Sequence, residues 1–220
     1  MFVKENLKEF KNKIPEHVML VAVSKTKPIA DIQEAYNAGQ RVFGENKIQE
    51  MAGKYDALPK DIQWHMIGHL QSNKVKYMAH FVDLIHGVDS LKTLKEINKQ
   101  AQKHNRTIAC IFQANIAKEE TKFGLCFENI KEILQSDELA GLKNIEIKGL
   151  MGMASFSSDE QVVSEEFKGL KLFYDKMNSL GAGFSILSMG MSGDYELAIA
   201  NGSNMIRVGS AIFGARNYIA

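Results

Sequence analysis

Short apolar runs alternate with longer amphipathic segments along the whole chain. The runs are rich in β-branched and aromatic residues, as strands are, whereas the segments between them repeat apolar residues with the period of a helix. The predicted strands span residues 19–24, 42–44, 62–66, 82–86, 107–114, 145–150, 184–189 and 205–208. The predicted helices span residues 2–13, 29–38, 46–58, 72–81, 90–103, 127–134, 160–180 and 193–201.

Capping signals support several of these helix boundaries. Asp89-Ser90 offers an N-cap before the helix at 90–103, and Ser158-Asp159 stands before the helix at 160–180. Gly39, Gly181 and Gly202 lie where helix C-termini are expected.

Eight strands, each next to a helix, favour a parallel sheet closed as a (β/α)8 TIM barrel, with an extra N-terminal helix before the first strand. Residues 1–220 contain three prolines and no low-complexity linker, so a single domain is the simpler interpretation. An open doubly wound sheet shows the same alternation and stays open as the alternative. No Gly-x-Gly-x-x-Gly fingerprint follows the first strand, which argues against a dinucleotide-binding fold.

Composition narrows the setting in which the protein works. A net charge of +1 gives no reason to expect nucleic acid or an anionic membrane as partner. Cys110 and Cys126 have no metal-binding spacing and are typical of reduced thiols in a cytosolic protein. The N-terminus has no apolar signal core, and no apolar stretch approaches the ~20 residues that span a bilayer. We therefore expect a cytoplasmic protein.

Lys25 is the first candidate for chemistry. It closes the apolar run Leu20–Ser24 and is followed by Thr26-Lys27-Pro28. This pattern predicts a buried strand with the lysine amine at its C-terminal end. Such a lysine is either a surface charge that extends to solvent, or a nucleophile whose neutral form is favoured by desolvation. In the second case it would form Schiff bases.

Polar and glycine-rich residues follow the predicted strands, where a barrel carries its functional site. These residues are Lys25, Gly44-Glu45-Asn46, His65, His86, Ala114-Asn115, Met151, Gly190-Met191-Ser192 and Arg207-Val208-Gly209-Ser210. The contrast with the apolar runs before them predicts a ligand pocket.

Two turns near the C-terminus have the features of a phosphate site. Ser192, followed by Gly193, fits the N-cap of the helix after the seventh strand, and Gly209 with Ser210 follows the eighth. Backbone N–H groups at such turns bind anions, and barrels commonly bind phosphate after strands seven and eight. Each turn alone is equally consistent with an ordinary loop and a capping serine.

Arg207 interrupts an apolar strand, and a buried guanidinium needs a partner. The partner is either a strand-end carboxylate such as Glu45 or an acceptor on a ligand. Asn46 caps the next helix or points its amide at the ring of a ligand. His65 and His69 have the spacing of a zinc pair but lack a third ligand, so no metal site is expected.

A Schiff-base lysine, a phosphate cradle and an arginine together indicate pyridoxal 5'-phosphate (PLP). Its aldehyde would meet Lys25, its phosphate would rest on Ser192, Gly209 and Ser210, and Arg207 would face the pyridine nitrogen. Because an arginine does not give up its proton, the nitrogen would stay neutral and the cofactor would be a weaker electron sink.

Six segments spread over nearly the whole chain form a recognisable set, namely Val23–Pro28, Phe43–Asn46, Trp64–Gly68, Leu70–Lys74, Leu187–Ser192 and Ile206–Arg216. In this order they resemble the YggS/PROSC family of PLP homeostasis proteins. The resemblance implies a barrel of the alanine racemase N-terminal-domain type. It also implies that Lys25 carries PLP, Arg207 faces the pyridine nitrogen, and Ser192, Gly209, Ser210 and Asn46 contact the cofactor. Lys47 departs from the aromatic residue expected after Asn46.

The resemblance implies PLP binding without established turnover. Alanine racemase uses a tyrosine from a second domain as its other base, and this chain ends at Ala220, soon after the last barrel segment. Tyr195 and Tyr218 are candidate substitutes but are better explained as packing or surface residues. A small racemase-like PLP enzyme is the main alternative, and a Schiff-base aldolase without PLP is another. We expect a monomer that passes PLP to apo-PLP enzymes.

Overall fold

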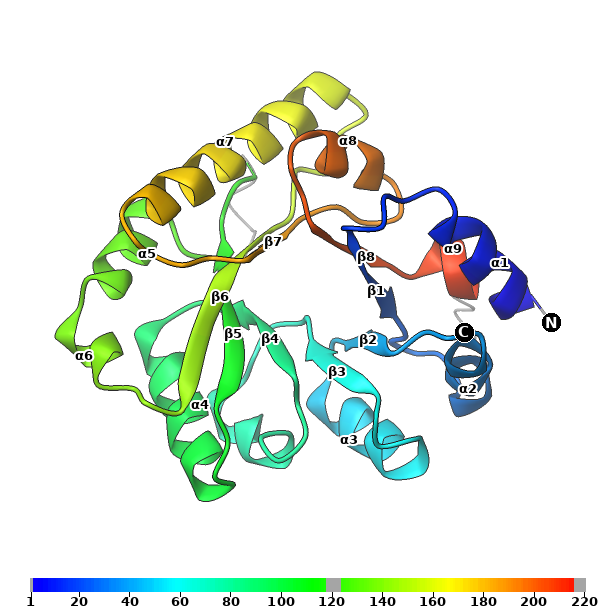
Figure 1. Cartoon of the computed structure of the whole chain (residues 1–220), viewed down its shortest axis with the longest axis horizontal. Coiled ribbons are helices and arrows are strands. Elements are labelled where there is room, and N and C mark those ends of the chain that lie inside the picture. The colour runs from blue at the N-terminus through cyan, green and yellow to red at the C-terminus, as the bar shows by residue number, and fades with distance from the viewer. Residues whose placement is uncertain (1, 118–123, 216–220) are drawn as a thin grey trace.

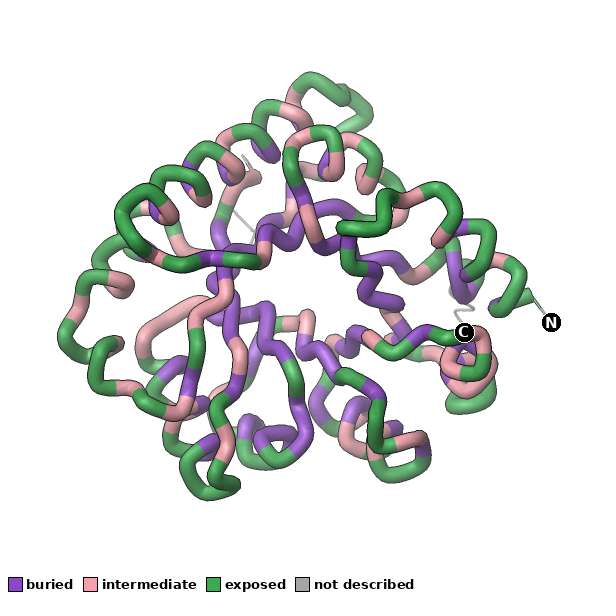
Figure 2. The backbone as a smooth tube through the Cα atoms, in the orientation of Figure 1, coloured by how far each residue is buried: buried purple, intermediate pink, exposed green. Residues whose placement is uncertain are grey.

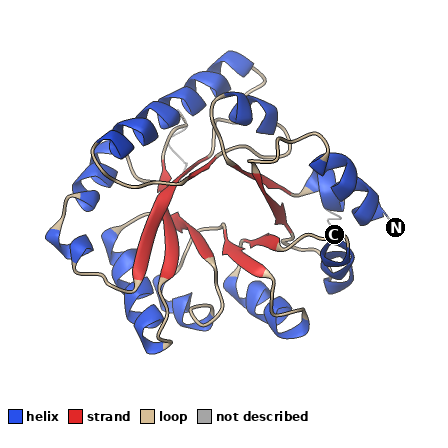
Figure 3. Cartoon of the chain, in the orientation of Figure 1, coloured by secondary structure: helices blue, strands red, loops and turns tan. Residues whose placement is uncertain are grey.

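The computed structural model describes residues 2–117 and 124–215, which form a closed barrel of eight parallel strands (Figure 1). The strands are β1 Met19–Val23, β2 Val42–Glu45, β3 Gln63–Met66, β4 Leu84–Val88, β5 Ile108–Ala114, β6 Ile145–Gly152, β7 Ile186–Ser188 and β8 Met205–Val208. The helices are α1 Phe2–Lys11, α2 Ile29–Asn37, α3 Ile48–Ala57, α4 Leu91–Lys103, α5 Phe127–Leu134, α6 Asp137–Ala140, α7 Glu160–Ser179, α8 Tyr195–Ala200 and α9 Ser210–Phe213, with a 3-10 helix η1 at Ser72–Tyr77. The helices surround the strands (Figure 3).

The strands follow one another around the barrel in chain order, and β8 pairs with β1 to close it. In this pairing Met19 lies opposite Met205 and Val21 lies opposite Arg207. The predicted barrel is therefore confirmed, and the open doubly wound sheet is wrong. The extra helix α1 precedes the barrel as predicted and lies beside α9 (Figure 1).

Two separate apolar cores hold the barrel together. The larger one lies between the strands and the surrounding helices, so that strands and inner helix faces are buried while outer helix faces are exposed (Figure 2). The smaller one fills the inside of the barrel with side chains from alternate strand positions. It consists of Val21, Leu84, Ile111, Met151 and Met205. On β1 and β8 the same alternation makes Val23 and Arg207, two positions after Val21 and Met205, point inward as well.

Helix caps agree with most of the predicted boundaries. The Ser90 hydroxyl accepts a hydrogen bond from the Thr93 N–H, and the Asp159 carboxylate accepts one from the Gln161 N–H. Gly39, Gly181 and Gly202 adopt φ angles of 91°, 91° and 90°, the left-handed conformation that ends helices.

Three helical segments differ from the prediction. The helix predicted at 72–81 is wrong, because only Ser72–Tyr77 is helical and it is a 3-10 helix. Residues 78–82 after this helix are irregular, and the Arg106 guanidinium fixes them by donating to the carbonyl oxygens of Ala79 and Val82. The short helices α6 and α9 were not predicted, because four residues are too few to show a helical period.

No helix within residues 2–117 and 124–215 is long and apolar enough to cross a bilayer.

Candidate functional site

A cavity of about 490 Å³ lies at the C-terminal ends of the strands. All six residues that the sequence predicted as cofactor contacts line it, namely Lys25, Asn46, Ser192, Arg207, Gly209 and Ser210. The other lining residues are Val23, Lys27, Ile67, Met153, Phe156, Met191, Gly193 and Gly214. The barrel thus brings together residues from both ends of the chain.

Lys25 lies just beyond the end of β1 and is half-buried. It stands four positions after Val21, so the alternation of a strand puts both on the inward face. Its neighbour Thr26 has a φ of 62°, a left-handed conformation that is unusual for a β-branched residue. The chain therefore turns sharply away from the barrel directly after the lysine.

Arg207 is buried inside the barrel and is bound by carbonyl and hydroxyl oxygens. Its Nη1 donates to the Ser188 carbonyl oxygen at 2.9 Å and to Ser188 Oγ at 2.7 Å, and Nη2 donates to the Gly152 carbonyl oxygen at 3.0 Å. Burial lowers the pKa of Arg207 to about 10, so the guanidinium keeps its charge at neutral pH. The three bonds use only part of the donor capacity of a guanidinium, and the side chain also lines the cavity.

The suggestion that Glu45 pairs with Arg207 is wrong. The Glu45 Oε1 atom accepts hydrogen bonds from Lys54 and from the Ser24 hydroxyl instead. Glu45 and Ser24 alternate along their strands with the inward-facing Gly44 and Lys25, so both point outward. Burial raises the pKa of the Glu45 carboxyl, and Lys54 and Ser24 oppose that rise.

The turn after β7 places Ser192 and Gly193 at the cavity. Gly190 has a φ of 98°, and a Cβ atom on it would lie 2.6 Å from the Ala198 Cβ, so glycine is needed where α8 packs against the turn. The predicted N-cap role of Ser192 is wrong, because α8 begins at Tyr195 after Asp194. The backbone N–H groups of Ser192 and Gly193 donate to no acceptor within the described residues.

The turn after β8 lies against the end of β1. A Cβ atom on Gly209 would come within 3.1 Å of the Val23 carbonyl oxygen, tighter than most Cβ contacts. Ser210 follows as the first residue of α9. Lys27 donates to the carbonyl oxygens of Phe213 and Gly214 at 2.8 and 3.1 Å, which ties the end of α9 to the loop after Lys25.

Asn46 follows β2 directly and does not cap α3, which begins two residues later without a side-chain cap. The Asn46 backbone packs so closely on Gly68 that a Cβ atom there would lie 2.5 Å from the Asn46 carbonyl oxygen. The side chain of Asn46 is half-buried at the cavity. Lys47, the residue that departs from the family pattern, is exposed.

His65 and His86 lie inside the barrel rather than at strand ends. Their rings meet through His86 Nε2 and His65 Nδ1 at 3.1 Å, and Asp83 Oδ2 lies 3.8 Å from His65 Nε2. His86 Nδ1 has no hydrogen-bond partner within the described residues. Burial lowers the pKa of both rings, most strongly that of His86, which is also repelled by His65 and Arg207. The pair is therefore neutral at physiological pH.

His69 does not join His65, and its Nδ1 lies 3.4 Å from Asp89 Oδ2. In the described part of the chain, no three His, Cys, Asp or Glu side chains are arranged to hold a metal ion.

Sequence reasoning missed several apolar cavity residues. Met153 could have been found, because it follows the end of β6 and stands two positions after the inward-facing Met151. Phe156 and Met191 lie in loops, where no periodicity indicates which way a side chain points. Both are exposed, with Phe156 at 101% of its reference area.

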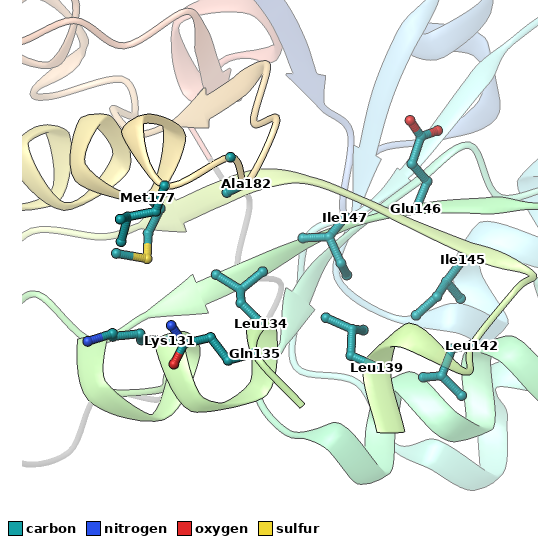
Figure 4. Close-up of a pocket in the computed structure, with 12 residues that line it drawn as sticks. Lys131, Leu134, Gln135, Leu139, Leu142, Ile145, Glu146, Ile147, Met177 and Ala182 are labelled. Atoms are coloured by element: carbon teal, nitrogen blue, oxygen red, sulfur yellow. The ribbon is translucent and has the colours of Figure 1, made fainter. Parts of the chain in front are cut away.

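A second hollow, of about 430 Å³, lies at the other end of the barrel, where β6 begins (Figure 4). It is bordered mainly by apolar side chains from α5, α6 and the end of α7, and the Glu146 side chain extends away from it. None of the predicted site residues lines it. The cavity at the C-terminal strand ends is therefore the better candidate.

Comparisons with known proteins agree with the fold and show the family. The architecture is that of the alanine racemase N-terminal domain, whose family model matches residues 2–217. The chain is 42% identical over 208 residues to the pyridoxal phosphate homeostasis protein of Synechocystis, covering 92% of this chain and 94% of that protein. It is 39% identical over 201 residues to the protein of the same name from Aquifex aeolicus, covering 90% and 87%.

Among solved structures, PipY of Synechococcus elongatus without PLP is 34% identical, with a TM-score of 0.90 over 96% of this chain and 100% of that one. PipY with PLP bound has a TM-score of 0.87 at the same identity and coverage. The chain therefore belongs to the alanine racemase N-terminal domain family and, within it, to the pyridoxal phosphate homeostasis proteins.

The buried histidine pair predicts how stability depends on pH. Because the native state holds His65 and His86 neutral while the unfolded chain protonates near pH ~6.5, stability falls as pH drops below that value. His86→Gln should reduce the slope of unfolding free energy against pH, by up to about 1.4 kcal/mol per pH unit once the unfolded histidine is fully protonated. Urea unfolding at a series of pH values from neutral downward measures this slope. The exposed His17 provides the control variant His17→Gln, and an unchanged slope in His86→Gln would contradict the prediction.

Proposed function

We propose that this protein binds PLP as a Schiff base in the cavity at the C-terminal strand ends and serves intracellular PLP homeostasis. One observation carries the proposal: the residues chosen from sequence as a PLP site all line one cavity, although they come from distant parts of the chain. The related PipY, whose structure contains PLP, supports it. In this proposal, residues 1–220 form a single PLP-binding domain.

The groups at the cavity fit the chemistry of the cofactor. Lys25 supplies the amine that an aldehyde requires, and the N–H groups of Ser192 and Gly193 are available to an anion. We assign the phosphate to Ser192, Gly209 and Ser210, and we assign Asn46 to a ring substituent. The close contact of Gly209 with Val23 lets the turn approach a ligand without an intervening side chain.

Arg207 determines what the bound cofactor could do. PLP supplies an electron sink, and that sink is strongest when a carboxylate keeps the ring nitrogen protonated. Arg207 is held by Ser188 and Gly152, and with a pKa of about 10 it stays a donor at neutral pH. A donor at this position leaves the ring nitrogen unprotonated, which favours holding PLP over using it for catalysis.

We propose that the protein does not turn over a substrate. Tyr195, a candidate second base, packs against Phe10 with ring centroids 4.8 Å apart, and its hydroxyl donates to Glu196. Its contacts therefore lie in the outer helical layer. Tyr218, the other candidate, lies outside the described residues. The name of the relatives, which refers to homeostasis and not to a reaction, agrees with this proposal.

We further propose a monomer that works in the cytoplasm, in contact with neither membrane nor nucleic acid, and that passes PLP to apo-PLP enzymes. Cys110 and Cys126 are free thiols, as expected in a reducing compartment.

Lys25→Ala should abolish the visible absorption band of a PLP Schiff base, because it removes the amine. The measurement is an absorption spectrum after incubation with PLP and desalting. Lys143→Ala, which removes an exposed lysine that donates to the Ala140 carbonyl oxygen, is the control and should keep the band. A wild-type protein that stays colourless would refute the proposed function.

The protein should not exchange the α-proton of amino acids for solvent deuterium. Exchange requires a base placed opposite the lysine in addition to an electron sink. Incubation of PLP-loaded protein with common amino acids in deuterium oxide, followed by mass spectrometry under single-turnover conditions, measures it. Incorporation that depends on Lys25 would instead favour the racemase-like alternative.

PLP-loaded protein should reactivate an apo-PLP enzyme faster than the same amount of free PLP in the presence of a PLP-trapping reagent. Direct transfer protects the cofactor from the trap, whereas release into solution does not. The time course of recovered enzyme activity measures it. Equal rates of reactivation from the protein and from free PLP would argue against delivery and leave storage as the function.

A further inference from the structure

Lys54 is a buried lysine that lies behind the cavity, on α3. Its side chain is 7% exposed. Its Nζ donates to the Ser24 carbonyl oxygen at 2.8 Å, to Glu45 Oε1 at 2.8 Å and to Glu50 Oε1 at 2.6 Å. An ammonium has three N–H donors, so each has an acceptor.

The groups bound to Lys54 reach both neighbours of Lys25. On one side, Lys54 binds the Ser24 carbonyl oxygen directly, and the Ser24 hydroxyl donates to Glu45 at 2.6 Å. On the other side, Glu50 Oε1 accepts the Thr26 backbone N–H at 2.6 Å. The residues before and after Lys25 are thus tied to one ammonium, from the outer side of the barrel wall.

Thr26 shows why such ties are needed. Its φ of 62° lies in the left-handed region, which β-branched residues rarely adopt. The other described residue with a positive φ outside glycine is Asn105, a type that tolerates this conformation. A strained backbone persists only where its surroundings fix it, and such strain is concentrated at functional sites.

We propose that Lys54, Glu50 and Glu45 are positioning residues for Lys25. They hold Ser24 and Thr26 so that the chain turns outward after the lysine while its amine stays at the cavity. This inference rests on the proposed function, in which Lys25 carries PLP. It adds a set of residues that do not line the cavity and act through the backbone.

The other explanation is that this cluster only stabilises the fold. Lys54→Met does not separate the two, because it leaves Glu45 buried without a counter-charge and should weaken folding. Glu50 is the better probe, since its side chain is 24% exposed and it contacts Thr26 directly. Glu50→Gln keeps an oxygen that can accept the Thr26 N–H, whereas Glu50→Ala does not.

The experiment compares full-length wild type, Glu50→Ala and Glu50→Gln, with Asp175→Ala as control. Asp175 forms an i,i+4 pair with Lys171 on α7, matching the helical spacing of Glu50 and Lys54. Apo-protein is mixed with PLP, and the visible band is followed over time. Borohydride reduction and peptide mass spectrometry then identify the modified lysine, and thermal unfolding is recorded for each variant.

Glu50→Ala should slow Schiff-base formation at Lys25 at least about tenfold, because misplacement by about 1 Å can cost on the order of a hundredfold. The rate of Schiff-base formation in Glu50→Gln should stay within about twofold of the wild-type rate, and the rate in Asp175→Ala should equal the wild-type rate. A wild-type rate in Glu50→Ala, or equal slowing in Glu50→Ala and Glu50→Gln, would overturn the proposal. A loss of thermal stability with an unchanged rate would assign the cluster a structural role alone.

A second readout needs no PLP. Apo-proteins are treated with limiting formaldehyde and cyanoborohydride, and the methylation of Lys25 is compared with that of exposed Lys143. Glu50→Ala should change this ratio, and its crystal structure should show Thr26 outside the left-handed region. An unchanged ratio with Thr26 in place would overturn the proposal. If wild type forms no Schiff base with PLP, the proposed function fails. The methylation ratio and the conformation of Thr26 in Glu50→Ala still decide whether the cluster positions Lys25.

Discussion

The hydrogen-bonded pairing of β1 with β8 is the contact on which the site depends. It puts Val21 opposite Arg207 and Ala22 opposite Val208. Because the two strands are parallel, their C-terminal ends emerge side by side, and the turn at Gly209 reaches the end of β1 beside Lys25. Without this closure, the lysine near the start of the chain and the glycine turn near its end would have no shared cavity.

The inside of the barrel contains buried polar side chains beside its small apolar core. Met205 belongs to the small inner core, and Arg207 stands two positions further along β8, level with Val21 of β1. Buried guanidinium groups usually need carboxylates, but Arg207 is held by the neutral oxygens of Ser188 and Gly152. No carboxylate of the described residues forms an ion pair with Arg207, and Asp194 stabilises its charge only through a longer-range electrostatic interaction.

The outer side of the barrel wall contributes as well. Strand alternation continues just past β1 and sends Lys25 inward and Ser24 outward, so the cavity lysine and the contacts of Ser24 lie on opposite sides of the barrel wall. Helix α3 carries Glu50 and Lys54 one turn apart, and both face this wall. A helix that would otherwise only cover the sheet thereby controls the backbone around Lys25.

Sequence patterns predicted the alternation of strands and helices, favoured a closed barrel over an open sheet, and selected six residues that prove to line one cavity. These follow from periodicity and from the rule that barrels carry polar residues at strand ends, which are properties of local segments. The partner of Arg207, the turn position of Ser192 and the inner pair of His65 and His86 were not predictable in this way. The hydrogen bonds from α3 to Ser24 and Thr26 were also not predictable from sequence patterns. Each depends on which side chains from different strands and helices come within hydrogen-bonding distance, and only the tertiary packing decides that.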